Sequence, residues 1–144
     1  IQQTVDRLAP VIPPERQWIL TSAALVDVIR EQLPEIPKRQ ILAEPAQRNT
    51  APAIGLAAHI LHSLDSRAVF GVFPADHLIA KEAAYRKLVR AAFRAAEQGR
   101  IVVLGVQPKW PETGYGYIEF PRQSEPGTVS TVKSFREKPD LATA

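Results

Sequence analysis

The stretch AVFGVFPADH, residues 68–77, joins an apolar run directly to an acidic residue and a histidine. Its apolar part is typical of a buried strand, which we expect over residues 69–73. In an open α/β sheet, ligands bind beyond the carboxyl ends of the strands, and Asp76 would stand there. Carboxylates suit Mg²⁺, which usually takes one or two of them together with phosphate oxygens of a substrate. An aspartate after a strand is also a common turn residue or helix cap, so both interpretations stay open.

Strand and helix patterns alternate on both sides of this stretch. Strands are expected at residues 17–20, 39–43, 69–73 and 101–106. Helices are expected at residues 22–33, 49–64 and 81–98, with a further helix end within residues 1–9. Such alternation predicts an α/β fold with a mostly parallel sheet and helices on both faces. The last predicted strand is an unbroken apolar run, as expected of a strand buried on both faces.

The last third of the chain has a different pattern. Residues 115–120 and 129–135 show a rough alternation of apolar and polar side chains, with no helix between them. A turn-forming cluster, Gln123-Ser124-Glu125-Pro126-Gly127, separates the two segments. We therefore expect a β-hairpin or a pair of added strands after the alternating region.

The composition excludes several classes of protein. The chain has 144 residues, 45% of them hydrophobic, which suits one domain over residues 1–144. It has no cysteine, which excludes disulfides and agrees with a cytoplasmic location. The net charge is +3, but basic and acidic residues are interleaved, so we expect no nucleic-acid partner. No apolar run is long enough to span a bilayer, and we expect no membrane partner. His59 and His62 lie three residues apart on an expected helix, but no third ligand that would complete a zinc site is evident.

A second group of polar residues follows the strand expected at 39–43. Glu44 and Pro45 come at its carboxyl end, and Arg48-Asn49-Thr50-Ala51-Pro52-Ala53 then begins a helix. A helix N-terminus offers free N–H groups and the positive end of the dipole, which favours a base or phosphate pocket. An ionised Glu44 can accept hydrogen bonds from both N1–H and N2–H of guanine, whereas adenine offers no such pair. The alternative is that this segment only caps the helix and places a proline in its first turn, without binding a ligand.

Two further segments combine glycines, aromatic residues and charges. Glu112-Thr113-Gly114-Tyr115-Gly116-Tyr117 would let a ligand approach the backbone closely at its glycines. Phe135-Arg136-Glu137-Lys138-Pro139 places an acid beside a base at a strand end. Glu137 could accept hydrogen bonds from sugar hydroxyls, and Lys138 could neutralise a phosphate. For the first segment, the alternative is a glycine-bearing loop that enters a core strand. For the second, it is a solvated, charged strand end.

Taken in order, these segments resemble one family, the mannose-1-phosphate guanylyltransferases (GDP-mannose pyrophosphorylases) of the sugar nucleotidyltransferase superfamily. The segments are residues 44–45 with 48–53, 74–77, 111–118 and 135–139. The resemblance implies a Rossmann-like α/β nucleotidyltransferase core. It also implies that GTP and mannose 1-phosphate are the partners and give GDP-mannose and pyrophosphate, with Mg²⁺ as cofactor. Positioning and electrostatic stabilisation would then supply most of the catalysis.

The resemblance also implies roles for individual residues. Asp76 and Lys138 would be catalytic, with Asp76 as the metal ligand. The nucleotide is expected at Glu44, Pro45, Asn49, Thr50, Ala75 and Asp76. The sugar phosphate is expected at Gly116, Glu137 and Lys138.

The chain departs from the family pattern in two places. The family's glycine-rich N-terminal loop, with its arginine and following lysine, is absent, and so is its second metal-binding aspartate. These departures predict an internal fragment of the catalytic domain, truncated at both ends and inactive by itself. Loss of a central strand would leave backbone groups unpaired, so we expect marginal stability or self-association into a homo-oligomer.

Two alternatives stay open. One is a related sugar-1-phosphate nucleotidyltransferase that uses another base or sugar, and Glu44 with Asn49 and Thr50 argues against it. The other is a non-catalytic regulatory relative that keeps the fold. Asp76 argues against the regulatory relative, because such proteins often lose the metal carboxylate.

Overall fold

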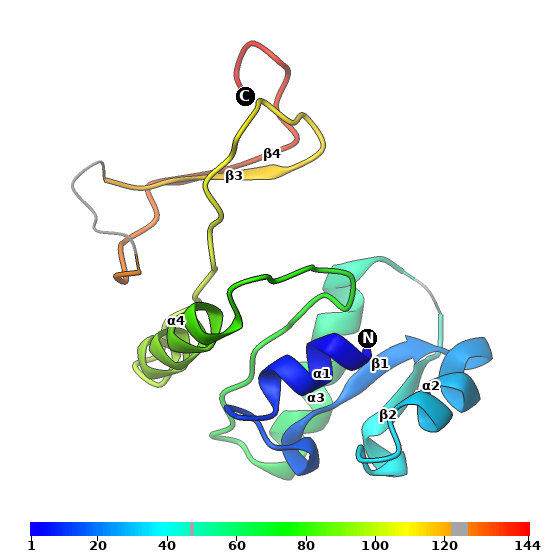
Figure 1. The fold of residues 1–144 in the computed structure, drawn as a ribbon. Coiled ribbons are helices and arrows are strands. Elements are labelled where there is room, and N and C mark those ends of the chain that lie inside the picture. Colours follow the sequence, from blue (N-terminus) through cyan, green and yellow to red (C-terminus); the bar gives the residue numbers. More distant parts are fainter. Residues whose placement is uncertain (47, 122–126) are drawn as a thin grey trace. The chain divides into compact units, whose positions relative to one another are not determined.

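The computed structural model describes residues 1–46, 48–121 and 127–144. It divides into two compact units, Ile1–Val89 (unit 1) and Arg90–Ala144 (unit 2). The division falls within one helix, α4 (Glu82–Ala96), which is drawn in green in Figure 1. Each unit therefore has its own packing and its own candidate site residues.

Unit 1 alternates helices and strands in the predicted order. Its helices before α4 are α1 (Gln2–Leu8), α2 (Val26–Gln32) and α3 (Thr50–Leu64), and its strands are β1 (Ile19–Ser22) and β2 (Ile41–Glu44). Short 3₁₀ turns precede β1, α2 and β2. Both strands begin two residues later than the sequence pattern predicts. The bounds of α3 confirm the predicted helix, because Asn49 is its N-cap and Pro52 lies in its first turn, where a proline is tolerated.

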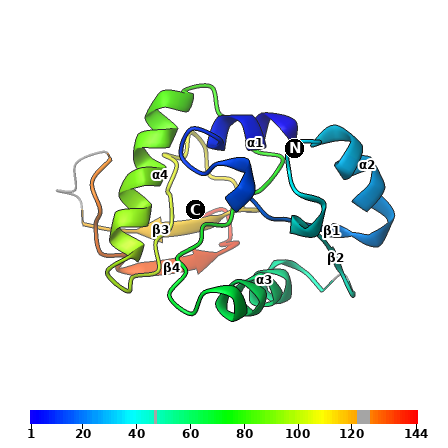
Figure 2. The same ribbon diagram turned by 90° about the horizontal axis from the view of Figure 1, so that it is seen from below.

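The strands β1 and β2 form a parallel pair, from Ile19 opposite Ile41 to Ser22 opposite Glu44. In Figure 2, α1 and α2 lie on one side of this pair and α3 lies on the other. Parallel neighbours need a crossover connection, and α2 supplies it. The carboxyl ends of both strands therefore meet at one edge of the pair, and Glu44 stands at that edge.

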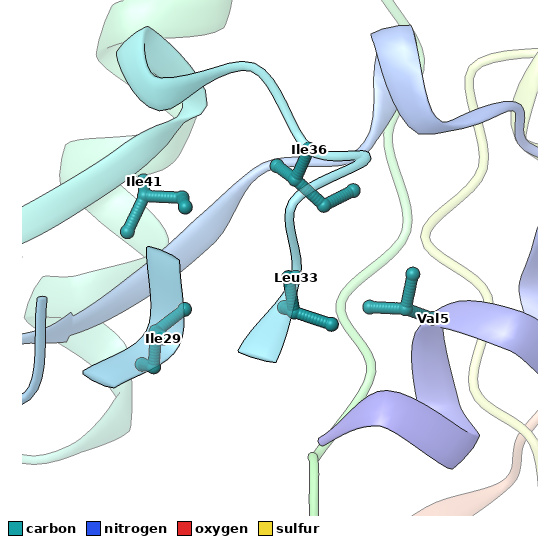
Figure 3. Packing of buried hydrophobic residues seen from close by; sticks show 5 residues of the cluster. All are labelled: Val5, Ile29, Leu33, Ile36 and Ile41. Atoms are coloured by element: carbon teal, nitrogen blue, oxygen red, sulfur yellow. The ribbon is translucent and has the colours of Figure 1, made fainter. Parts of the chain in front are cut away.

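Five apolar side chains form the core of unit 1, and Figure 3 shows them facing one another. They come from α1, from α2 and the loop after it, and from β2, and each is at most 8% exposed: Val5, Ile29, Leu33, Ile36 and Ile41. Ile29 and Leu33 are four residues apart, so they share one face of the helical turn. Burial of this face explains why a short helix such as α2 is stable here, since helices of this length depend on tertiary packing.

Two buried glutamines tie the loop after α1 to its surroundings. Gln17 Nε2 donates to the carbonyl of Ile12 at 2.8 Å and to that of Val5 at 3.3 Å. Gln40 Nε2 donates to the carbonyl of Pro14 at 3.2 Å and also to that of Gln17. Buried backbone carbonyls require partners, and these side chains add to the backbone N–H groups of Ala9 and Gln17, which donate to the carbonyls of Val5 and Pro14.

Unit 2 contains an antiparallel pair, β3 (Gly116–Glu119) and β4 (Ser134–Glu137). The register runs from Gly116 opposite Glu137 to Glu119 opposite Ser134. This pairing confirms the two strands expected in the last third, although β4 lies later in the chain than the pattern predicts. Most of the turn cluster predicted at 123–127 lies outside the described residues, and Gly127 adopts a φ of 83°.

Both long helices lie where the sequence predicts. α3 and α4 have 15 residues each, and Gly99 follows α4 with a φ of 80°, a conformation that suits glycine after a helix. None of the helices among the described residues is long and apolar enough to cross a membrane.

Two of the predicted strands are wrong. Residues 69–73 and 101–106 form no strand in the part of the chain that the structure describes. The second run, predicted to be buried on both faces, is largely exposed, with Ile101 100% and Val106 89% accessible. The physical reason is that an apolar run records a tendency toward burial, whereas a strand needs a hydrogen-bonded neighbour, and neither run pairs with another described strand.

Candidate functional site

Glu44 is the last residue of β2, at the carboxyl edge of the parallel pair. Its side chain is partly buried and forms no hydrogen bond or ion pair with the other described residues. Pro45 follows in a bend that takes the backbone out of the strand. An ionised carboxylate only accepts hydrogen bonds, so an unpaired Glu44 can take N–H donors from a ligand.

Asn49 holds a strained backbone at the start of α3. Its φ is 65° and its ψ is −173°, a region that is essentially reserved for glycine. Its side chain makes no capping hydrogen bond, so the predicted N-cap position is confirmed while the usual reason for an asparagine there is missing. Thr50 begins the helix, and the N–H groups of a first helical turn have no partner within the helix. The strain and the free donors mark this helix start as a candidate binding element.

Asp76 lies in a tight turn with Ala75, after the apolar run at 69–73. Its carboxylate is exposed and lines a pocket of about 280 Å³, whose other wall is the start of α1. The backbone is held on both sides of Asp76: the Thr4 hydroxyl donates to the Ala75 carbonyl at 3.3 Å, and Arg7 Nη2 donates to the His77 carbonyl at 3.4 Å. The turn is therefore anchored, while the Asp76 side chain itself stays available.

The donor set around Asp76 fits Mg²⁺ better than a transition metal. Among the described residues, no group of three or more His, Cys, Asp or Glu side chains could hold a metal ion. A closed zinc site needs such a group. Mg²⁺ instead keeps several waters and uses one or two carboxylates plus substrate phosphates, so a single exposed carboxylate beside a pocket is compatible with it. His59 and His62 are both exposed on α3.

In unit 2, the hairpin brings Gly116, Glu137 and Phe135 together. Gly116 is paired with Glu137 in the register, and the Phe135 ring covers the space above the glycine. A Cβ atom at Gly116 would overlap the Phe135 ring and would lie 2.8 Å from Glu137 Oε2. Only glycine therefore fits at this position while the ring and the carboxylate keep their places.

Lys138 directly follows β4 and has a φ of 44°, another conformation that side chains rarely adopt. Its backbone N–H donates to the Tyr115 carbonyl at 3.0 Å, which fixes the backbone in spite of the strain. Its ammonium nitrogen lies 3.8 Å from Glu137 Oε1, and both side chains are more than half exposed. An exposed pair at this distance contributes little to stability, so both charges remain available to a ligand.

The loop before β3 is ordered by Glu112. Its carboxylate accepts the Gly114 N–H at 3.1 Å, and its carbonyl accepts the Tyr117 hydroxyl at 3.0 Å. These bonds shape the glycine-bearing loop that leads to Gly116. The alternative of a glycine-bearing loop that enters a core strand does not describe this segment, because Tyr117 in β3 is only partly buried.

Sequence reasoning missed the residues that support the candidate site residues within each unit. Thr4 and Arg7 hold the Asp76 turn, and Phe135 covers Gly116. Arg7 also stacks on Tyr85, with its guanidinium carbon 5.6 Å from the ring centroid. Burial raises the pKa of the Tyr85 hydroxyl, and the Arg7 charge offsets part of that rise. The one indication in the sequence was Arg7 itself, a basic residue beside Leu8 on the apolar side of α1.

The predicted site residues thus fall into two groups. Glu44, Asn49 and Asp76 belong to unit 1, at the end of β2, the start of α3 and the anchored turn. Gly116, Glu137 and Lys138 belong to unit 2, where the hairpin brings them together. The binding roles of both groups stay predictions.

Comparison with known families gives one match over the whole chain. The family described as nucleotidyl transferase matches residues 1–144. Its members transfer a nucleotidyl group, as that name states.

Three relatives illustrate the similarity to curated proteins. The chain is 45% identical to the mannose-1-phosphate guanylyltransferase of Escherichia coli K12 over 124 residues, which are 81% of this chain and 26% of the relative. It is 41% identical to the alginate biosynthesis protein AlgA of Pseudomonas aeruginosa over 146 aligned residues, 99% of this chain and 30% of the relative. It is 50% identical to the xanthan biosynthesis protein XanB of Xanthomonas campestris over 105 residues, 72% of this chain and 22% of the relative. The chain therefore spans less than a third of the length of these relatives.

A solved structure is similar over nearly the whole chain. It is described as a mannose-1-phosphate geranyltransferase from Thermus thermophilus. The TM-score is 0.84 at 36% identity, over 98% of this chain and 40% of the other. This likeness confirms the α/β fold class that the alternating pattern predicts.

Proposed function

The chain belongs to the nucleotidyl transferase family, and on this premise we propose that the protein transfers GMP from GTP to mannose 1-phosphate. The resemblance to mannose-1-phosphate guanylyltransferases that the sequence motifs indicate is confirmed by relatives of that name. In the proposed reaction, a phosphate oxygen of mannose 1-phosphate forms a bond to the α-phosphorus of GTP. The bond from that phosphorus to the β-phosphate oxygen breaks, and pyrophosphate leaves with the electron pair.

One structural observation carries the proposal. Among the described residues, the non-glycine residues with positive φ are Asn49 and Lys138. Both belong to the site that the motifs predict, one for the nucleotide and one for the sugar phosphate. Strained backbones cluster at functional sites, because the surrounding structure must hold them in place. Two such residues at two positions that the resemblance predicts favour a binding site over a solvated strand end or a plain helix cap.

The residues of unit 1 serve the nucleotide in this proposal. Glu44 accepts hydrogen bonds from guanine N1–H and N2–H, and the Asn49–Thr50 helix start donates N–H groups. Asp76 holds Mg²⁺, which when bound supplies positive charge against the phosphates. Pro45 and Ala75 shape the backbone beside these groups.

The residues of unit 2 serve the sugar phosphate. Lys138 neutralises the phosphate with its exposed ammonium group, and Glu137 accepts hydrogen bonds from sugar hydroxyls. Gly116 leaves the space in which the Phe135 ring and the Glu137 carboxylate lie, so the acceptor keeps its direction. Because these groups position and stabilise charge, the reaction needs no general base.

The proposal is tested by pyrophosphate release from the protein as its natural gene encodes it. GTP and mannose 1-phosphate are supplied with Mg²⁺, and ATP and glucose 1-phosphate replace them one at a time as controls. We expect release that is selective for GTP and mannose 1-phosphate and that Asp76→Ala abolishes. Release with another pair would assign a different base or sugar. No release with any pair would favour a non-catalytic relative.

A further inference from the structure

Two side chains of α1 donate hydrogen bonds to the backbone carbonyls on either side of Asp76. Thr4 Oγ1 lies 3.3 Å from the Ala75 carbonyl oxygen, and Arg7 Nη2 lies 3.4 Å from that of His77. Thr4 and Arg7 are one helical turn apart, so they point to the same side of α1. These bonds cross about 70 residues of sequence, whereas the Asp76 carboxylate has no partner among the described residues.

The bonds form a directed chain. Arg7 Nη2 also donates to Thr4 Oγ1 at 3.0 Å, and the Thr4 hydroxyl hydrogen is then free to point to the Ala75 carbonyl. One hydroxyl can donate only once, so Arg7 fixes the direction in which Thr4 donates. Hydrogen bonds in such a chain polarise one another and strengthen the whole.

Arg7 is a buried cation whose guanidinium group contacts both Thr4 and the turn. Arg7 is 3% exposed and Thr4 is 7% exposed. Within the described residues, no carboxylate forms an ion pair with Arg7, and its Nε has no hydrogen-bond partner. A buried cation without a carboxylate costs stability. Its compensation comes from the Tyr85 ring, the Thr4 hydroxyl and the His77 carbonyl.

A second contact keeps α1 itself in place. Arg86 Nη1 donates to the Arg7 carbonyl at 3.3 Å and forms an ion pair with Glu82 at 3.0 Å. The end of α1 is therefore tied to the first half of α4, within unit 1. The chain of contacts runs from α4 through α1 to the turn.

We propose that Thr4 and Arg7 are positioning residues, which fix the 75–77 backbone and thereby aim the Asp76 carboxylate at the bound Mg²⁺. The inference rests on the proposed function, because it requires Asp76 to be the metal ligand. The peptide groups before and after a residue determine where its Cα–Cβ bond points. A turn that is held only on one side lets that bond swing, and a carboxylate that must be ordered on binding holds metal more weakly.

The test compares three variants in the natural protein. Thr4→Val removes the hydroxyl with almost no change in shape, Thr4→Ser keeps the hydroxyl, and Arg7→Lys keeps the charge but loses the planar fork. The readouts are the Mg²⁺ concentration for half-maximal pyrophosphate release and direct Mn²⁺ binding by electron paramagnetic resonance. We expect Thr4→Val and Arg7→Lys to weaken metal binding roughly tenfold. Thr4→Ser, which keeps the hydroxyl, should bind the metal about as tightly as the wild type.

Gln40→Leu is the matched control. It also removes buried hydrogen bonds to backbone carbonyls in unit 1, but those carbonyls belong to Pro14 and Gln17, away from the turn. We expect this variant to lower the melting temperature and to leave the metal dependence unchanged. If Arg7→Lys does not fold, the pair Thr4→Val and Thr4→Ser decides the question.

Two negative results are distinguishable. Metal binding that is weakened by Asp76→Asn but unchanged in Thr4→Val and Arg7→Lys would overturn the positioning role alone. Metal binding and activity that Asp76→Asn leaves unchanged would overturn the metal role of Asp76, and with it both the proposed function of that residue and this inference.

Discussion

Units 1 and 2 are held together in different ways. Unit 1 has a closed apolar core of five side chains and buried polar bonds that join α1 to the Asp76 turn. The β3–β4 hairpin of unit 2 instead carries large side chains on its surface, with Phe135 59% exposed. Its order comes from the ladder, from the fit of Gly116 under a ring, and from bonds around Glu112.

This difference indicates where effects on stability and on ligand binding can be separated. In unit 1, the predicted metal ligand lies on a turn that the buried network supports, so changes there affect folding and metal binding together. In unit 2, the predicted sugar-phosphate side chains, Glu137 and Lys138, are exposed. Their removal leaves no buried cavity and no buried group without a partner. Substitution of the exposed Glu137 and Lys138 side chains should therefore change ligand binding more than stability.

The largest expected effect is in the core of unit 1. Leu33 is 1% exposed, so Leu33→Ala should lower the free energy of unfolding by about 3–5 kcal/mol through lost burial and a cavity. Urea denaturation measures the change. Val28→Ala is the control, because Val28 lies on α2, which Leu33 directly follows, and is 47% exposed. A loss below about 1 kcal/mol for Leu33→Ala would show that this cluster is not the core of unit 1.

The next effect contrasts two glycines. Gly116→Ala should displace the Phe135 ring and the Glu137 carboxylate, cost about 1–3 kcal/mol of stability and raise the KM for mannose 1-phosphate. Gly55→Ala in α3 meets nothing within 4 Å, so it should stabilise the protein by about 1 kcal/mol through helix propensity. Thermal melting and substrate titration of both variants measure the difference. Equal effects at the two positions would contradict the close fit described for the hairpin.

Much of the fold was predictable because its signals are local. The N-cap at Asn49 and the proline in the first turn defined α3, and alternation with α2 indicated the parallel pair. The strands expected at 69–73 and 101–106 were wrong because pairing depends on a neighbour that an apolar run does not reveal. In the site, the motifs pointed to Asp76, Gly116 and Lys138.

The anchoring of the site was not predictable, since it depends on contacts between distant segments. Thr4 and Arg7 meet the 75–77 turn across about 70 residues, and Phe135 reaches Gly116 only through the register of the hairpin. The positive φ of Asn49 was hidden as well, because asparagine is a common helix cap in a relaxed conformation.

A smaller effect is expected at Asn49. Asn49→Gly relieves the strain of a φ of 65° and should raise the free energy of unfolding by up to about 1 kcal/mol. If Asn49 contacts the nucleotide, the same variant should raise the KM for GTP and leave that for mannose 1-phosphate unchanged. Asn49→Ala is the companion variant, since it removes the amide but keeps the strain. A stability gain without any change in the KM for GTP would make the strain purely structural.

The smallest effect is at the end of unit 2. Hydrogen bonds from the Thr143 side chain and from its backbone N–H, the latter at 2.8 Å, hold the pKa of the Asp140 carboxyl below its usual value. A folded-state pKa below the unfolded one adds stability above the unfolded pKa and loses it as the pH falls through the folded pKa. A carboxyl titration by NMR should therefore give a depressed pKa that Thr143→Val raises. An Asp140 pKa at the ordinary value of about 3.9 would contradict the turn.

We propose that the metal and the nucleotide bind to residues of unit 1 and that the sugar phosphate binds to residues of unit 2. The most direct test is the KM for each substrate in Lys138→Met, measured by pyrophosphate release at saturating Mg²⁺. We predict that the KM for mannose 1-phosphate rises about 10- to 100-fold, as expected for loss of a charged hydrogen bond, while the KM for GTP changes by less than about twofold. An equal rise in both constants, or a rise for GTP alone, would contradict the division.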